Sequence, residues 1–426
     1  MAIEDDVLVI GGGLAGATAA IAAARGGAAV RLVTYKENTL RNASGLIDVL
    51  GYHGSDEPIA EPFEAIPDLP DEHPYRKVGV DAVRESLALF DEITEDFYEG
   101  SHTETNALSP TYGGRVKPTS RYPASAAAGL ASRLEETLLV GFETVTTFDA
   151  PLAAERLDSS VPFDVRGVTI PFPGDYRADA RITRLAGALD ADDVLDRQRR
   201  IGTREVLAAR VAEHLGNAER VGFPAILGDH EPREVRESLE SELGVPVFEV
   251  PMGPPSLPGM RLEDRLERAL DEEGVRVEAG NPVVGYDEDD GRITAAYVDR
   301  GRRRVPYHAE QVVLATGGLV GKGIDSDREG VTEPVFDCHV PQSEDRYEWF
   351  HDEVFDDQPY ARFGVRVDED LRPLSSNGKP EFANLRATGA VLGDYDLARE
   401  KSGSGVSLST GLVAGRRASE DLQHNE

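Results

Sequence analysis

Three glycines near the start of the chain, Gly11, Gly13 and Gly16, follow the pattern Gly-X-Gly-X-X-Gly. The apolar run at 7–10 predicts a strand buried on both faces, and the small residues at 14–25 predict a helix. In this context glycine permits a tight turn, a close approach of the backbone to phosphate, and close packing of the helix on the strand. The helix N-terminus favours an anion. We therefore predict a nucleotide-phosphate site made of Gly11, Gly12, Gly13, Leu14, Ala15 and Gly16.

The second strand of this βαβ unit, predicted over 29–34, departs from the usual dinucleotide pattern. A strand in this position usually ends in Asp or Glu, which binds the adenosine ribose. Here the position holds Thr34, and the nearest acidic residue is Glu37. Two interpretations remain open. Either Thr34 or Glu37 holds the ribose, or the cofactor is a mononucleotide and no adenosine is bound.

Further small-residue turns could approach a planar redox ring. Ser44-Gly45 follows the second strand, and Thr316-Gly317 ends an apolar strand predicted from 311. Near the C-terminus, Gly389 ends a short strand, and a glycine-rich loop at 402–411, which contains Gly405 and Val406, opens a terminal helix. Amides at such a helix start stabilise the negative charge of a reduced flavin, by up to ~2 kcal/mol. We therefore expect the glycines of both chain ends to converge around one flavin.

The composition restricts the classes of partner. The 426 residues include 78 acidic and 45 basic residues, for a net charge of −33, and only six of the basic residues are Lys. An acidic surface poor in Lys stays hydrated in concentrated salt, which indicates a halophilic source. The charge disfavours nucleic acid and anionic lipid as partners, because both need basic patches.

The single cysteine, Cys338, permits no internal disulfide and cannot by itself hold an iron–sulfur cluster or a structural zinc. We therefore expect no metal in this chain, and any cluster should lie on another chain. No stretch approaches the roughly 20 apolar residues that span a membrane, and the N-terminus lacks a signal peptide pattern. We expect a cytoplasmic protein that reaches a membrane only through a partner subunit.

The order of the elements predicts an α/β fold. Its main part is a Rossmann-like FAD/NAD(P)-binding domain of the glutathione-reductase-like type, which is discontinuous because a cap domain is inserted. We predict the flavin-binding domain over 1–105 and 275–426, and a mixed α+β cap or substrate domain over 106–274. The sequence shows no clear acid–base pair, so it assigns no catalytic residue. Lys117 and Arg121 either bind a substrate phosphate or form ion pairs, and His339 either transfers protons or is structural.

Several longer motifs extend this pattern across the chain. They are the glycine turn, Ser44 to Leu50, His73-Pro74-Tyr75, Gly330 to Val335, Phe363 to Val365 with Leu371 to Pro373, and Thr388 to Asp396. In these motifs the chain resembles the family of B-type subunits of anaerobic glycerol-3-phosphate dehydrogenases. The resemblance implies a flavin-dependent oxidoreductase subunit that binds FMN, with FAD as the alternative.

The same resemblance implies a three-part complex. A catalytic FAD subunit oxidises sn-glycerol 3-phosphate to dihydroxyacetone phosphate, and an iron–sulfur subunit anchors the assembly and passes electrons to membrane quinone. This chain would relay electrons between the two, at the inner face of the membrane. Two other functions remain open. One is a stand-alone FAD-dependent dehydrogenase or reductase of the fumarate-reductase-like type, and the other is a structural subunit without a cofactor.

Overall fold

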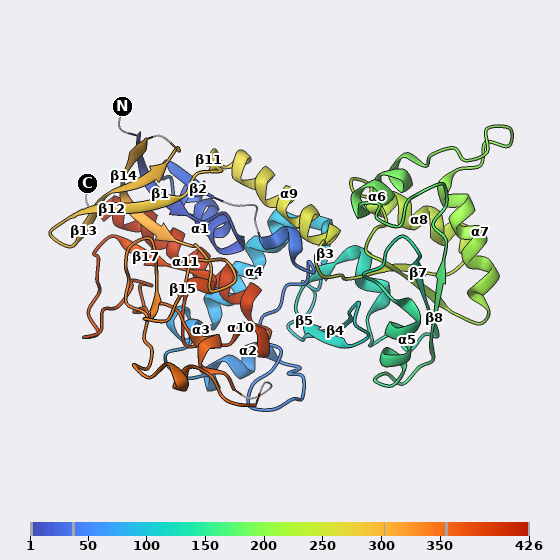
Figure 1. Ribbon diagram of the computed structural model, residues 1–426, viewed down its shortest axis with the longest axis horizontal. Helices are drawn as coiled ribbons and strands as arrows, with labels where there is room; N and C mark the ends of the chain where they lie inside the picture. Colours follow the sequence, from blue (N-terminus) through green and yellow to red (C-terminus); the bar gives the residue numbers. More distant parts are fainter. Residues whose placement is uncertain (1–2, 36–38, 302, 354–356, 425–426) are drawn as a thin grey trace. The chain divides into compact units, whose positions relative to one another are not determined.

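The computed structural model describes residues 3–35, 39–301, 303–353 and 357–424. The chain forms two compact units (Figure 1). The first unit comprises Met1–Thr39, Asp48–Ile93 and Arg265–Glu426, and the second comprises Leu40–Ile47 and Thr94–Asp264. The chain therefore crosses between the units four times. The assignment of a flavin-binding domain and a cap domain to these units, with our boundaries at 105/106 and 274/275, stays a prediction.

The first unit is built on one seven-stranded sheet in the order β11-β2-β1-β14-β13-β12, with β17 also paired to β14 (Figure 1). Its strands are β1 (Ile3–Ile10), β2 (Val30–Thr34), β11 (Arg276–Ala279), β12 (Val283–Asp289), β13 (Arg292–Asp299), β14 (Arg304–Leu314) and β17 (Leu385–Ala387). The strands β11, β2, β1, β14 and β17 run parallel to one another, whereas β13 pairs antiparallel with both of its neighbours, β14 and β12. The apolar run at 7–10 is fully buried, as we predicted for the centre of a parallel sheet.

Two parallel helices, α1 (Leu14–Arg25) and α11 (Gly403–His424), pack closely in this unit. A Cβ atom at Gly411 would lie 2.6 Å from the Ala15 carbonyl oxygen, and one at Gly415 would lie 2.1 Å from that of Ala19. Gly411 is thus level with Ala15. Because Gly403 precedes Gly411 by eight residues and Leu14 precedes Ala15 by one, α11 starts about 10 Å beyond the start of α1.

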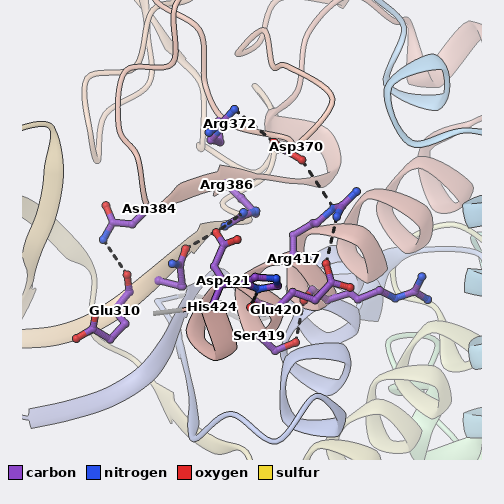
Figure 2. A network of polar contacts seen from close by, with 12 residues as sticks. Glu310, Asp370, Arg372, Asn384, Arg386, Arg417, Ser419, Glu420, Asp421 and His424 are labelled. Carbon is purple, nitrogen blue, oxygen red and sulfur yellow. Dashed lines mark hydrogen bonds and ion pairs between the residues drawn. The ribbon is translucent and has the colours of Figure 1, made fainter. Parts of the chain in front are cut away.

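A polar network ties the end of α11 to the amino end of β17 (Figure 2). The buried Arg386 side chain donates to Gln311 Oε1 at 2.9 Å and to Asp421 Oδ2 at 2.7 Å. The amide of Asn384 donates to the carbonyl oxygens of Ile293 and Glu310 at 2.9 and 3.0 Å. Strand β17 is only three residues long and makes few backbone hydrogen bonds. The side-chain hydrogen bonds therefore help to fix its position beside β14.

The second unit contains a separate four-stranded parallel sheet in the order β10-β9-β7-β8. Its strands are β7 (Thr137–Phe142), β8 (Val165–Ile170), β9 (Arg220–Pro224) and β10 (Val247–Val250), and its helices include α5 (Ala150–Asp158), α6 (Ile182–Ala191), α7 (Thr203–Leu215) and α8 (Pro232–Leu243). Two short antiparallel pairs, β3 (Tyr98–Glu99) with β6 (Tyr122–Pro123) and β4 (Ala107–Pro110) with β5 (Val116–Thr119), accompany the sheet.

A buried ion pair holds the carboxyl end of this second sheet. The Arg261 guanidinium contacts the Glu249 carboxylate at 2.7 and 3.1 Å, and both side chains are at most 3% exposed. Ser125 Oγ and the amide of Leu227 also donate to Glu249, each at 2.7 Å. Burial alone would raise the pKa of Glu249, but the bonds from Arg261 and the other donors lower it below its usual value.

Candidate functional site

The carboxyl ends of β1, β2 and β14 meet at one pocket of the first unit, with a cavity volume of about 320 Å³. This is the edge at which open parallel sheets bind nucleotides. Most of its lining residues are small. They are Ile10, Gly11, Gly12, Gly13, Val33, Thr34, Tyr35, Thr39, Asn281, Pro282, Val283, Ala315, Thr316, Gly317, Gly321, Lys322, Pro334 and Val335. Six predicted site residues are among them: Gly11, Gly12, Gly13, Thr34, Thr316 and Gly317.

The glycine turn is as tight as we predicted. Gly11 has a φ of +116°, and a Cβ there would lie 2.1 Å from the Ala315 carbonyl oxygen of the neighbouring strand end. A Cβ at Gly16 would lie 1.9 Å from the carbonyl oxygen of Gly11. The glycines therefore allow β1, the turn and α1 to approach each other more closely than any side chain permits.

The start of α1 is suited to an anion. Its N-cap is Gly13, which offers no side-chain cap, and its first turn holds no acidic residue. The positive end of the helix dipole is therefore not compensated by a carboxylate of the helix's own first turn. Backbone amides at this turn can bind a phosphate group.

The charge of the pocket contrasts with that of the chain. Among its described lining residues there is no Asp or Glu, and Lys322 is the one charged side chain. The Lys322 side chain is 64% exposed and lies 3.8 Å from Asp325 Oδ1. In a chain with a net charge of −33, a pocket whose described lining residues include one ammonium group and no carboxylate favours a phosphorylated ligand.

A buried hydroxyl also fits a bound group. Thr316 Oγ1 is buried and has no hydrogen-bond partner among the described residues. Gly317, next to it, has a φ of +83°. A buried hydroxyl is normally hydrogen-bonded, so a ligand oxygen or an ordered water in the pocket would satisfy it.

The pocket continues past the glycine turn to the end of β2. Thr34 and Tyr35 lie on one side of this part, and Asn281, Pro282 and Val283 line it as well. This is the region in which a dinucleotide places its adenosine half. Thr34 takes the place of the usual carboxylate there, and Glu37, our other candidate for the ribose, lies outside the described residues.

The other predicted site residues have packing roles in the structure. Leu14, Ala15 and Gly16 form the buried first turn of α1, behind the glycine turn. A Cβ at Gly389 would lie 2.6 Å from the Ala15 Cβ, which explains a glycine at that point. The amide of Gly405 donates to the Asp48 carbonyl oxygen at 2.7 Å, and Val406, beside it in α11, is fully buried. Gly389, Gly405 and Val406 do not line the pocket.

Ser44 and Gly45 belong to the second unit. There Gly45 has a φ of +80°, a Cβ on it would lie 2.7 Å from the Pro258 Cβ, and its carbonyl oxygen accepts a bond from the Tyr98 hydroxyl. Their contact with a flavin stays a prediction, as do the flavin contacts of Gly389, Gly405 and Val406.

Four other residues singled out in the sequence have defined places. Arg121 is buried in the second unit and donates to the carbonyl oxygens of Gly100 and Ser120, both at 3.1 Å. Lys117 is half-buried in β5. In the first unit, His339 is half-buried, and burial together with nearby carboxylates such as Glu333 raises the pKa of the Cys338 thiol. The Arg121 contacts favour a structural role for that side chain.

Sequence reasoning did not find Lys322, Tyr35 or the segment from Asn281 to Val283. The rarity of Lys was an available signal for Lys322, because Arg serves as the ordinary cation of this chain. The segment at 281–283 carries no motif, and only the pairing of β11 with β2 brings it to the pocket.

Among the described residues, no helix is both long enough and apolar enough to cross a bilayer. No cluster of three or more His, Cys, Asp or Glu side chains among them has the geometry of a metal site.

Comparison with known proteins gives a family. A family model described as an FAD binding domain matches residues 6–406. The chain is 59% identical, over 100% of both chains, to a protein of Halobacterium salinarum named as a probable B-type subunit of anaerobic glycerol-3-phosphate dehydrogenase. It is 31% identical, over 96% of both chains, to the protein of Yersinia pestis that is named as the same subunit of that enzyme. The match to an FAD binding domain confirms the predicted fold class, and the Halobacterium relative agrees with the predicted halophilic source.

Among solved structures, the chain aligns with 3-ketosteroid delta1-dehydrogenase from Sterolibacterium denitrificans. The alignment covers 99% of this chain and 100% of that chain, with 11% sequence identity and a TM-score of 0.43. A similarity at this level is too weak to support an inference, so the assignment rests on the family match and the two relatives.

Proposed function

The chain belongs to the family of FAD-binding domains and, within it, to the B-type subunits of anaerobic glycerol-3-phosphate dehydrogenases, and we propose that it is the flavin-carrying subunit of such an enzyme. Membership confirms the family and the class of flavin-dependent oxidoreductase that we predicted from the sequence. The observation that carries the proposal is the pocket at the glycine turn, which has no carboxylate and one Lys among its described lining residues.

FMN, our first prediction for the cofactor, is not confirmed, because the matching family is one of FAD-binding domains. We propose FAD. The pocket supports this choice, since it extends from Gly13 past Thr34 to Val283 and so offers room beyond a single phosphate. A mononucleotide would use only the glycine turn and leave the part at the end of β2 without a role.

The residues of this chain have separate tasks in holding the cofactor. The amides of the glycine turn, the start of α1 and the Lys322 ammonium group would bind the diphosphate. Thr34 would donate to or accept from the ribose, in place of a carboxylate. The bound flavin supplies chemistry that takes up two electrons and releases them one at a time. Orientation and the local electric field are the protein's contribution.

We propose the partners and the substrate from the relatives' names and the resemblance. In this proposal the complex oxidises sn-glycerol 3-phosphate to dihydroxyacetone phosphate, and a catalytic FAD subunit passes the electrons to this chain. An iron–sulfur subunit then takes them to membrane quinone, so that this chain lies at the inner face of the membrane through its partner. The single cysteine supports the assignment of the clusters to another chain.

The cofactor assignment is tested by heating the purified chain and separating the released flavin by chromatography. FAD supports the proposal, whereas FMN would overturn the cofactor assignment while leaving the flavin subunit in place. A chain purified from its own source without any flavin would favour a structural subunit and overturn the proposed function.

The electron-relay role is tested by kinetics with a soluble dye as the electron acceptor. We expect glycerol 3-phosphate to reduce the dye only when the catalytic partner subunit is present. Turnover by this chain alone would favour a stand-alone dehydrogenase and would contradict the relay.

A further inference from the structure

A buried polar cluster surrounds the start of α11 in the first unit. We define the α11-start cluster as His73, Tyr75, Tyr395, Glu400 and Ser402, of which all but Glu400 are at most 2% exposed. His73 and Tyr75 belong to one motif of the sequence, and Tyr395 to another, yet neither motif reaches the nucleotide pocket. The cluster therefore needs an explanation of its own.

Glu400 is the centre of the cluster. Its Oε2 accepts from Ser402 Oγ at 2.9 Å and lies 3.1 Å from His73 Nε2, and its Oε1 accepts from the backbone amide of Asp396 at 3.1 Å. Its backbone carbonyl oxygen accepts from the amides of Gly51 and Tyr52 at 2.7 and 3.0 Å. One residue thus joins the short helix α10 (Leu397–Glu400) to two other segments.

The surroundings of His73 define which of its ring nitrogens carries a proton. Nδ1 lies 3.1 Å from the backbone amide nitrogen of Tyr75, which can only donate, so Nδ1 must accept. A neutral imidazole then carries its proton on Nε2 and donates it to Glu400. The His73 side chain is 1% exposed, so its own ring has little contact with solvent. With this tautomer, His73 is a hydrogen-bond donor to the Glu400 side chain.

Tyr75 and Asp48 fix the first turn of α11 in place. The Tyr75 hydroxyl donates to the carbonyl oxygen of Val49 at 2.5 Å and contacts that of Ser402 at 3.3 Å. A Cβ at Gly405 would lie 2.1 Å from this hydroxyl, so only glycine fits beneath it. The Gly405 amide donates to the backbone carbonyl oxygen of Asp48. The helix start cannot shift without breaking several buried hydrogen bonds.

The position of this helix start matters for the cofactor. Helix α11 begins about 10 Å beyond the start of α1, on the side of the sheet's carboxyl edge where the nucleotide pocket lies. If the diphosphate occupies the glycine turn, as we propose, and the ring extends toward Gly405 and Val406, as we predicted, the ring would come near the start of α11.

We infer that Glu400, with His73 as its hydrogen-bond donor, is a positioning residue that sets the reduction potential of the bound flavin. Its carboxylate lies immediately before the positive end of the α11 dipole and opposes it. A negative charge at the start of α11 disfavours the anionic reduced flavin. The hydrogen bond that His73 donates to the carboxylate reduces this effect. The inference rests on the proposed function.

The test measures the midpoint potential of the flavin in the purified holoprotein. In the variant Glu400→Gln we expect about a tenfold shift toward the reduced form, which is about 30 mV more positive for a two-electron couple. In Ser402→Ala the carboxylate loses one donor, and we expect a smaller shift of the opposite sign. The second variant removes only one oxygen atom, so it folds even where Glu400→Gln does not.

Asp421→Asn is the matched control. It replaces a carboxylate on the same helix by an amide and also removes the partner of a buried cation, Arg386, but about 27 Å farther along α11. We expect it to lower the thermal stability and to leave the potential unchanged. A purely structural role of Glu400 would make the two variants behave alike.

The outcomes separate this inference from the proposed function. Flavin bound at full occupancy with the same potential in Glu400→Gln, Ser402→Ala and wild type would overturn the inference alone. A wild-type chain that binds no flavin would overturn both. Shifts of opposite sign in the two variants, with no shift in Asp421→Asn, support the inference.

Discussion

The two edges of the first unit's central sheet are built from different side chains. At the carboxyl edge, where β1 and β14 end, the described lining residues are mostly glycines and small neutral residues. Near the amino edge, ion pairs join neighbouring strands: the nearly buried Asp5 pairs with Arg31 and Arg276 at 2.6 and 2.7 Å. Arg386, in the middle of β17, pairs with Asp421 near the end of α11. The carboxyl edge therefore leaves backbone groups accessible to a ligand, whereas the ion pairs at the amino edge connect neighbouring strands.

This difference teaches how one sheet can combine binding with stability. A phosphate site needs a close approach of the backbone and no competing carboxylates. An acidic chain also uses its cations to compensate its own charge, as Arg31 and Arg276 do for Asp5 near the amino edge. Changes at the carboxyl edge should therefore alter flavin binding, whereas changes at the amino edge should alter only the free energy of unfolding.

The largest effect is expected for Gly11→Val at the carboxyl edge. The new Cβ would lie 2.1 Å from the Ala315 carbonyl oxygen, at a φ that valine disfavours. We expect a loss of about 3 kcal/mol or more in the free energy of unfolding and no bound flavin. Urea denaturation and the ratio of flavin to protein measure both.

Gly27→Ala is the control for this variant. Gly27 also has a positive φ, +92°, but a Cβ there meets nothing within 4 Å. We expect a loss of about 1 kcal/mol in the free energy of unfolding, with flavin retained. Equal flavin loss in both variants would show that backbone strain, and not the close approach of the strands, explains the result for Gly11.

The next effect concerns Arg386→Met in β17, where the side chain bonds to Gln311 and Asp421 outside the pocket. This change leaves the buried oxygen Gln311 Oε1 without its donor, while Asp421, which is 41% exposed, regains water. We expect a loss of about 2 kcal/mol in the free energy of unfolding, measured by urea denaturation. The ratio of flavin to folded protein should stay at the wild-type value. A folded variant that lacks flavin would contradict the separation of binding from stability.

A smaller effect is expected for Lys322→Gln. The change removes the one charge among the described lining residues and keeps a polar side chain that is one atom shorter. We expect the dissociation constant of FAD for the apoprotein to rise about three- to tenfold, since an exposed charge contributes on the order of 1 kcal/mol. The effect should shrink as salt is added. Fluorescence titration measures it, with Lys379→Gln, at an exposed Lys outside the pocket, as the control.

The smallest effect is expected at Cys338, which lies outside both edges. The side chain is 3% exposed, and burial raises the pKa of its thiol, with the carboxylate of Glu333 adding to the shift. We expect iodoacetamide to label less than about a tenth of the native protein at neutral pH and all of it in urea. Mass spectrometry measures the labelling. Rapid labelling of the native chain would identify Cys338 as a reactive group and contradict its inert role.

Sequence patterns predicted the local parts of the site because they depend on neighbours along the chain. The apolar run before Gly11, the small residues after Gly16 and the missing acid at Thr34 are all readable in order. The structure brings Thr316-Gly317 to the same pocket, as we expected from the strand that precedes it. Gly389 and Gly405 also have close contacts with Ala15 and Tyr75 that no local pattern indicated, and their contact with a flavin stays a prediction.

The chain's order of residues was sufficient to establish the glycine turn, the fold class, the acidic surface and the family. The first three follow from composition and from the preferences of short segments, whereas the family was indicated by a resemblance in motifs that are spread along the chain. Only the folded chain could bring Asn281 to Val283 beside Thr34, seat Glu400 beside His73, and put α11 about 10 Å ahead of α1. Those arrangements join residues that lie far apart in the sequence, and they depend on which strands pair and which helices pack, so no local pattern encodes them.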